Sequence, residues 1–200
     1  MASILQDLQK TVIAGFVLAL VLFIIYIIAL GFDVEFWRFL FRWLHVISGV
    51  MWIGLLWYFN FVQIPNMAKI PDEQKPAIGK VIAPAALWWF RWGAMATIVT
   101  GLILATLNGY ILGAVTLGIA TGSAGHLAIG IGMWLGAIMW FNVWFIIWPN
   151  QKKALGMVTV EADAKAKAAR TAMLFSRANT LLSIPMLFAM VSAQSLYHIS

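Results

Sequence analysis

Four long runs without Asp, Glu, Lys or Arg constrain the fold of this chain more than any other feature. They cover Thr11–Phe32, Trp43–Ala68, Trp92–Gln151 and Ala178–Ser200. A helix needs about 20 apolar residues to cross a bilayer, so three runs predict one span each and the longest, Trp92–Gln151, predicts two. The sequence therefore predicts an all-α integral membrane protein with five transmembrane helices, near residues 11–31, 37–62, 87–107, 123–148 and 176–197.

The composition agrees with membrane insertion and narrows the possible functions. Hydrophobic residues make up 63% of the chain and charged residues only 10%, which is unlike a soluble domain. We expect the net charge of +6 to mark topology, and we expect no nucleic-acid partner. Since there is no cysteine, the chain has no disulfides, no iron–sulfur ligands and no covalent c-type haem attachment.

The basic residues are distributed unequally across the predicted spans. Arg38 and Arg42 fall on one side, and the other Lys and Arg residues fall on the opposite side. Cytoplasmic loops are enriched in Lys and Arg, so we expect a cytoplasmic N-terminus and an external C-terminus. The residues on the predicted cytoplasmic side are Lys10, Lys69, Lys75, Lys80, Arg91, Lys152, Lys153, Lys165, Lys167, Arg170 and Arg177.

An internal repeat defines the expected organisation. The segment His45–Gly54 returns as His126–Gly136 with one residue inserted, and each copy continues to a Phe-Asn and then a Pro-Asn pair. We expect residues 1–35 to form an anchor helix and residues 36–200 a four-helix domain of two parallel hairpins, 36–107 and 123–197. The connection 108–122 is expected to be an outer hairpin, 71–84 to be irregular, 160–172 to be a solvated helix, and Pro185 to kink the last span.

The two repeated histidines are the strongest functional candidates. A polar ring in lipid is costly without a partner, and His45 and His126 occupy matched positions in the two copies. Two imidazoles are a suitable axial pair for a b-type haem held inside a four-helix bundle. Gly49 and Gly130, one turn after each His, would leave room for a flat porphyrin, and Met51 and Met133 would help to shape the slot.

Other interpretations of these residues remain open. The two His residues can instead form hydrogen bonds between helices that the glycines bring close together, or serve a proton or metal site. Arg38 and Arg42 can pair with haem propionates or extend to the membrane interface. His198, near the C-terminus, is expected to have no role.

A second polar layer is expected on the inner side. Its residues can line a small-molecule or quinone pocket, orient water for proton transfer, or cross-link helices. They are Asn60, Arg91, Asn142, Gln151, Arg177 and Asn179.

The chain resembles the membrane domain of the bacterial urate oxidase/hydroxylase family and, more distantly, haem-binding membrane proteins related to bacterial protoporphyrinogen oxidase. The segments that carry the resemblance are Arg42–Gly54, Trp89–Leu104, His126–Gln151 and Ser176–Gln194. The resemblance implies a haem-associated redox domain in the bacterial inner membrane.

Three functions follow from these observations. The first is a membrane b-type haem protein that passes electrons to or from a partner, such as a cytochrome c or a respiratory complex. The second is a membrane oxidase of urate or a similar small heterocycle. The third is a cofactor-free accessory subunit of a respiratory complex.

Overall fold

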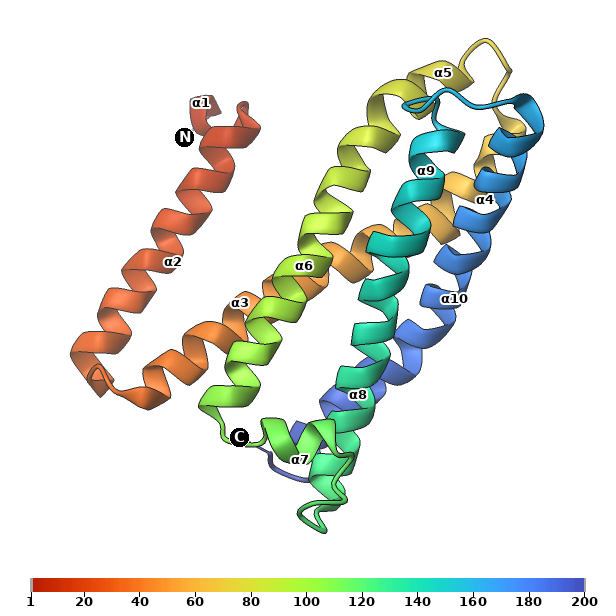
Figure 1. The fold of residues 1–200 in the computed structure, drawn as a ribbon. Coiled ribbons are helices and arrows are strands. Elements are labelled where there is room, and N and C mark those ends of the chain that lie inside the picture. Colours follow the sequence, from red (N-terminus) through yellow and green to blue (C-terminus); the bar gives the residue numbers. More distant parts are fainter. Residues whose placement is uncertain (1, 200) are drawn as a thin grey trace. The chain divides into compact units, whose positions relative to one another are not determined.

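The computed structural model describes residues 2–199, and every regular element in that range is helical (Figure 1). Five helical stretches are long and apolar enough to cross a membrane: Leu8–Leu30, Val34–Lys69, Lys75–Leu107, Ala124–Ala154 and Ala162–Ser195. The predicted all-α class and the five helices are therefore confirmed, while insertion into a membrane remains a prediction. The chain divides into two compact units, Met1–Leu40 and Phe41–Ser200.

The first unit contains α1 (Ala2–Leu5), α2 (Leu8–Leu30) and the beginning of α3 (Val34–Trp57). Asp7 caps α2 by accepting hydrogen bonds from the backbone N–H groups of Gln9 and Lys10, at 2.9 and 3.2 Å. Phe23 of α2 contacts Phe36 of α3, with ring centroids 5.6 Å apart. No residue of α2 is buried, which is the exposure expected for a helix that faces lipid.

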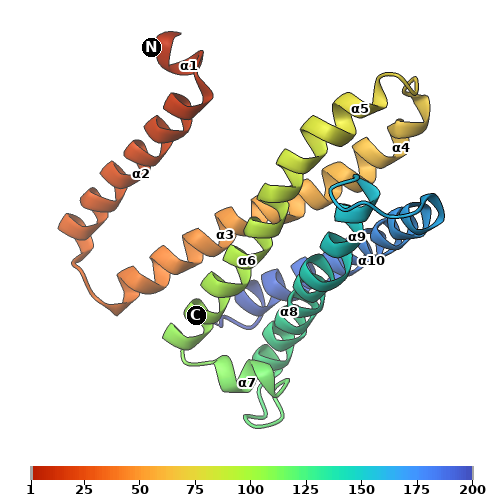
Figure 2. The same ribbon diagram turned by 45° about the horizontal axis from the view of Figure 1, so that its top comes forward.

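The second unit is a helical bundle. Its long elements are the remainder of α3 with η1 (Tyr58–Gln63), α6 (Ala83–Leu107), α8 (Ala124–Phe141) with η4 (Asn142–Ile147), and α10 (Ala162–Ser195). Shorter elements are α4 (Ile64–Asn66), η2 (Met67–Lys69), α5 (Lys75–Ala77), η3 (Ile78–Ile82), α7 (Ile111–Val115) and α9 (Trp148–Ala154). In Figures 1 and 2, α8 runs alongside α10, and α7 lies against α8.

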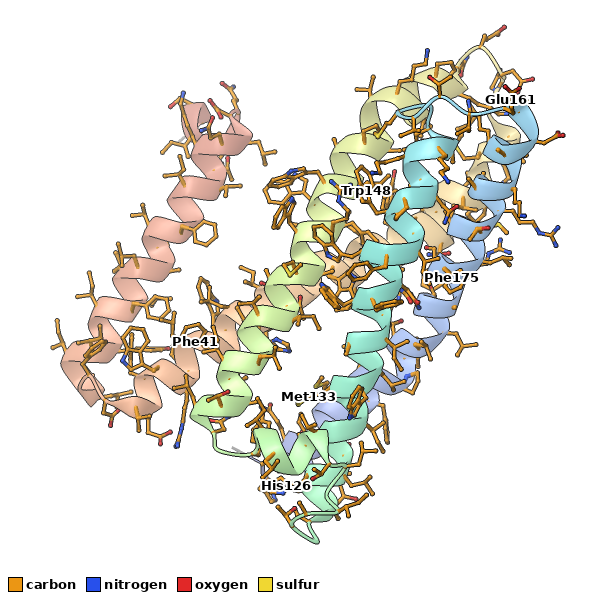
Figure 3. The ribbon with its side chains drawn as sticks, viewed as in Figure 1. Phe41, His126, Met133, Trp148, Glu161 and Phe175 are labelled. Atoms are coloured by element: carbon orange, nitrogen blue, oxygen red, sulfur yellow. The ribbon has the colours of Figure 1, made fainter. Side chains whose placement is uncertain are left out.

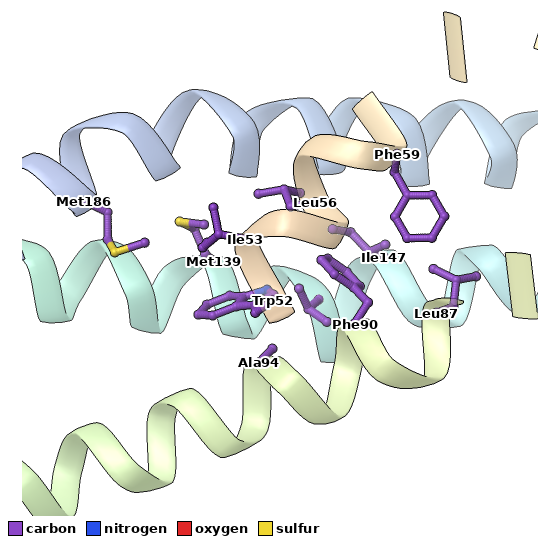
Figure 4. Close-up of a cluster of buried hydrophobic side chains, with 11 residues drawn as sticks. Trp52, Ile53, Leu56, Phe59, Leu87, Phe90, Ala94, Met139, Ile147 and Met186 are labelled. Carbon is purple, nitrogen blue, oxygen red and sulfur yellow. The ribbon is translucent and has the colours of Figure 1, made fainter. Parts of the chain in front are cut away.

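The core of this unit is apolar and draws on all four long elements (Figure 4). Trp52 and Leu56 of α3 meet Phe90 of α6 and Met139 of α8, and each is almost fully buried. Close approach is possible at Gly93 of α6, where an added Cβ would lie 3.3 Å from the backbone nitrogen of Trp52. The dense contacts of these side chains stabilise the bundle by dispersion, whatever solvent surrounds it.

Each π-helical segment in the described chain ends two residues before a proline. The pairs are η1 with Pro65, η3 with Pro84 and η4 with Pro149. A proline lacks an N–H and clashes with the carbonyl four residues before it, and a local π turn lets the helix continue past it. After two of them an Asn side chain binds the carbonyl four residues back: Asn66 to Val62 and Asn150 to Ile146, at 2.7 and 2.8 Å.

The connections differ from the expectation in two places. The predicted separate helix over 160–172 is wrong as a separate element, because α10 begins at Ala162 and continues without interruption to Ser195. The Ala-rich segment at the beginning of α10 is a good helix former, and it lengthens the last predicted span by several turns. The expected irregular stretch 71–84 is also helical from Lys75 onward. The connection 108–122 holds only the short α7, so it is not a sixth span.

Candidate functional site

His45 of α3 is held against α6. Its Nδ1 lies 2.9 Å from the carbonyl oxygen of Thr97. A carbonyl oxygen can only accept a hydrogen bond, so Nδ1 carries the proton and the Nε2 lone pair is free to act as an acceptor or ligand. The ring rests on Gly101, where an added Cβ would lie 2.8 Å from Cε1 of His45.

His126, at the start of α8, is held in a similar way against α7. Its Nδ1 lies 2.7 Å from the hydroxyl oxygen of Thr121, and that hydroxyl donates to the carbonyl of Gly118 at 3.4 Å. The tautomer of His126 that carries its proton on Nδ1 fits both contacts of the Thr121 hydroxyl. The ring rests on Gly113, where an added Cβ would lie 2.5 Å from Nδ1. Figure 3 shows His126 near α7.

Both imidazoles therefore share one chemical arrangement. Nδ1 is engaged in each ring, and Nε2 has no hydrogen-bond partner within residues 2–199. Metal-ligating histidines characteristically bind the metal through one nitrogen and anchor the other to an oxygen, which fixes tautomer and ring orientation. The donor chemistry of His45 and His126 fits a haem iron. No group of three His, Asp or Glu side chains that could enclose a metal occurs in the described chain.

The two glycines expected beside a porphyrin differ from each other. Gly49 has no neighbouring atom within 4 Å of an added Cβ, so the space beside it is open. An added Cβ at Gly130 would lie 2.3 Å from the carbonyl oxygen of Ala114, because α7 packs directly on this face of α8. The expectation that Gly130 leaves an open slot is therefore wrong: its missing side chain allows α7 and α8 to approach each other.

Tyr110, directly before α7, lies beside His126. Its ring centroid is 6.5 Å from that of His126. Burial raises the pKa of Tyr110, and the adjacent Asn108 side chain and the positive charge of Arg42 oppose that shift. Arg42 lies one turn before His45 on α3, and its Nε is buried with no hydrogen-bond partner in the described chain. Tyr110 thus stays protonated at neutral pH.

The remaining residues proposed for the haem site have ordinary surroundings. Arg38 belongs to the first unit and forms an ion pair with Glu35. Met51 is exposed, although its Cγ lies against Gly93, and Met133 packs in a small cluster with Tyr110 and its neighbours. His198 is exposed after the end of α10.

The inner polar layer is organised by one stripe of α10. This stripe consists of Ser176, Asn179 and Ser183, all buried. Asn142 of η4 donates to Asn179 at 2.8 Å, and Asn179 donates to the carbonyl of Met139 at 2.9 Å. From the other repeat, Asn60 donates to Ser176 at 2.8 Å and Trp57 to Ser183 at 2.9 Å.

The matched residues Asn60 and Asn142 therefore both bind α10, three residues apart along one helix. In a strictly parallel pair of hairpins, Asn60 would bind α6 as Asn142 binds α10. The hydrogen bonds thus do not follow the sequence repeat, and they match the helix cross-linking interpretation of the layer. Arg177 is exposed and lies outside the α10 stripe.

Two further members of the layer each have a buried atom without a hydrogen-bond partner in residues 2–199. Arg91 of α6 is only 9% exposed, stacks over Trp148 with its Cζ 3.3 Å from the ring centroid, and has a buried Nη1 without a hydrogen-bond partner in residues 2–199. The buried Oε1 of Gln151 likewise has no partner in that range. A buried polar atom without a partner costs free energy, so these groups remain available to a ligand or water.

Several residues at these sites could not be assigned from the sequence. Thr97, Gly101, Gly113 and Thr121 hold the two imidazoles, and Ser176 and Ser183 receive the polar groups of α3 and η1. Ser176, Asn179 and Ser183 are spaced by three and four residues. This spacing predicts that they lie on one face of a helix.

Because α7 packs on one face of α8, substitution of Gly130 should affect stability more than substitution of Gly136 on the same helix. We expect Gly130→Ala to lower the free energy of unfolding by about 1–3 kcal/mol, because the new methyl group must displace the Ala114 backbone. Gly136→Ala is the matched control, since nothing lies within 4 Å of its added Cβ. Thermal unfolding of the two variants in detergent measures the difference, and equal midpoints would contradict this packing.

Residues 111–199 match the family model described as urate oxidase N-terminal. The match begins at α7 and includes His126, Gly130 and Asn142, whereas His45 lies outside it. No curated protein and no solved structure matches the chain. The predicted similarity to the urate oxidase N-terminal family is thus confirmed for residues 111–199.

Proposed function

We propose that the chain is a b-type haem redox protein of the bacterial inner membrane, in which His45 and His126 would hold the haem iron. It passes electrons to or from a protein partner such as a cytochrome c or a respiratory complex. The observation that carries the proposal is the shared state of the two imidazoles, each anchored at Nδ1 and unpartnered at Nε2 within residues 2–199. Bound haem would supply one-electron transfer.

The chain's own residues contribute orientation and charge. The Thr97 carbonyl and the Thr121 hydroxyl hold the two Nδ1 protons, which keeps each Nε2 lone pair available. Gly49 leaves space beside His45, and the guanidinium of Arg42 can pair with a propionate at the same end of the bundle. Five long apolar helices support the membrane setting.

A second candidate is a membrane oxidase of urate or a similar small heterocycle that uses the same haem. The urate oxidase N-terminal match over residues 111–199 favours it. The partnerless Arg91 and Gln151 atoms of the inner layer are groups that a polar substrate could bind. This candidate differs from the first in requiring that the substrate itself reduce the haem.

The absorption spectrum of the purified protein tests the proposal. We expect a Soret band and split alpha and beta bands on reduction with dithionite, and a pyridine haemochrome spectrum of b type. A preparation from haem-supplemented cells that shows no such bands contradicts the proposal and favours a cofactor-free accessory subunit.

Urate added to the oxidised protein separates the two redox candidates. If the protein serves only a partner, urate leaves the spectrum oxidised, and a reduced cytochrome c or quinol changes it. Reduction by urate at a rate that depends on its concentration would favour the oxidase. Allantoin, which has lost the conjugated ring system, is the matched control ligand.

A further inference from the structure

Two cations of the second unit lie over one indole ring. The guanidinium Cζ of Arg91 is 3.3 Å from the centroid of Trp148, and the Nζ of Lys152 is 5.6 Å from it. Figure 3 shows Trp148 between α6 and α9, far along the bundle from His126. None of the ion pairs formed within residues 2–199 includes Arg91 or Lys152.

The positions of these two cations in the sequence are informative. Arg91 immediately precedes the charge-free run Trp92–Gln151, and Lys152 immediately follows it. Arg91 and Lys152 both lie over the ring of Trp148. The start and the end of the charge-free run are therefore close together in the bundle. In a membrane this level is the boundary between acyl chains and headgroups, where Trp, Lys and Arg collect.

Arg91 is unusual for a cation at such a boundary. Its side chain is about nine-tenths buried, and the buried Nη1 has no hydrogen-bond partner in the described chain. The indole face attracts the guanidinium but cannot neutralise it, and a buried charge without a counter-ion is costly. Lys152 is only half-buried, so an anion can approach from its side.

We propose that Arg91 and Lys152, held by Trp148, form a binding site for a phosphate group. A phosphate presents several acceptor oxygens at once, which suits a planar guanidinium and an ammonium that converge from two helices. The phosphate belongs to the headgroup of an anionic phospholipid or to free phosphate, since both present the same oxygens. This site lies apart from the two histidines, and the inference does not depend on haem.

Native mass spectrometry of the full chain from nanodiscs tests the site. In nanodiscs that mix phosphatidylcholine with phosphatidylglycerol, we expect the wild type to retain phosphatidylglycerol selectively. Arg91→Gln and Lys152→Gln should each lower that retention about tenfold or more, since each removes a charge-assisted bond. Lys153→Gln is the matched control, because it removes the same charge from the exposed neighbouring residue and should retain the lipid.

The source of the phosphate is distinguished by a second arm. In nanodiscs of phosphatidylcholine alone, inorganic phosphate is titrated while its 31P line width is followed. Broadening that the Arg91→Gln variant lacks, without selective lipid retention, supports the same site with free phosphate as its ligand. Equal behaviour of wild type, Arg91→Gln and Lys152→Gln in both arms overturns the proposal. Circular dichroism shows whether each variant is folded. If Arg91→Gln does not fold, the comparison of Lys152→Gln with the wild type decides whether the phosphate site exists.

Discussion

The His45→Ala variant is expected to lose the low-spin b-type spectrum, and His126→Ala is expected to lose it as well. Low-spin haem needs two strong axial ligands, so removing either imidazole leaves a five-coordinate, high-spin iron or releases the haem. The effect is close to all-or-none at the alpha band. It is measured on purified protein as the reduced-minus-oxidised spectrum and as haem content per chain.

His198→Ala is the control for this pair. It makes the same chemical change at a histidine that is exposed beyond the end of α10. It should keep the full spectrum. Size-exclusion profiles of all three variants exclude loss of the fold as the cause. If His45→Ala and His126→Ala both retain the wild-type Soret and alpha bands, these residues are not the ligands.

Asn179→Leu is expected to cause the largest loss of stability among substitutions in the polar layer. Asn179 is fully buried, accepts from Asn142 at 2.8 Å and donates to the Met139 carbonyl at 2.9 Å. Leucine has the same branched skeleton with bulkier methyl groups, and it leaves the buried Asn142 amide without its side-chain partner, which costs about 1–3 kcal/mol. The Met139 carbonyl keeps the backbone N–H of Asn142 as a partner. Unfolding by SDS in mixed micelles, followed by circular dichroism, measures this change.

A double-mutant cycle separates the hydrogen bond from simple loss of packing. When Asn142→Leu is added, no unsatisfied amide remains between the two helices, so the double variant should be more stable than the sum of the single effects predicts. Asn150→Leu is a matched control, since Asn150 binds only a carbonyl of its own helical segment. Strict additivity between Asn142 and Asn179 would contradict their pairing.

The sequence was sufficient to predict the helices, because the runs without charge have the length that a bilayer requires. It was not sufficient to predict the neighbours of each functional side chain. His45 and His126 were evident as the two histidines of the repeated motif, but their glycine and threonine contacts depend on which helices pack together. For the same reason the surroundings of Gly130 were predicted wrongly. Its neighbour is the short helix α7 rather than another long helix.

Some deviations could have been anticipated from local chemistry. Pro65, Pro84 and Pro149 each follow a π-helical segment, whose local change of register accommodates the proline. Pro185 instead lies inside α10, which continues past it as an α-helix. The continuous α10 follows from the alanine-rich sequence before its apolar half. The exposure of Arg177 follows from its place next to Ser176, since adjacent residues of a helix point about 100° apart.

The hydrogen bonds from α3 and η1 to α10 also constrain the order of assembly during synthesis. Trp57 and Ser183 are 126 residues apart, and Asn60 and Ser176 are 116 apart. At about 5–20 residues per second, a ribosome needs ~6–23 s to reach Ser176 after it has made Asn60. During that interval the Trp57 indole N–H must be satisfied by water, the insertion machinery or another protein, whereas the Asn60 amide still donates to the Leu56 carbonyl four residues back. The last helix therefore completes the bundle, and a nascent chain stalled before α10 would be the form most exposed to quality-control proteases.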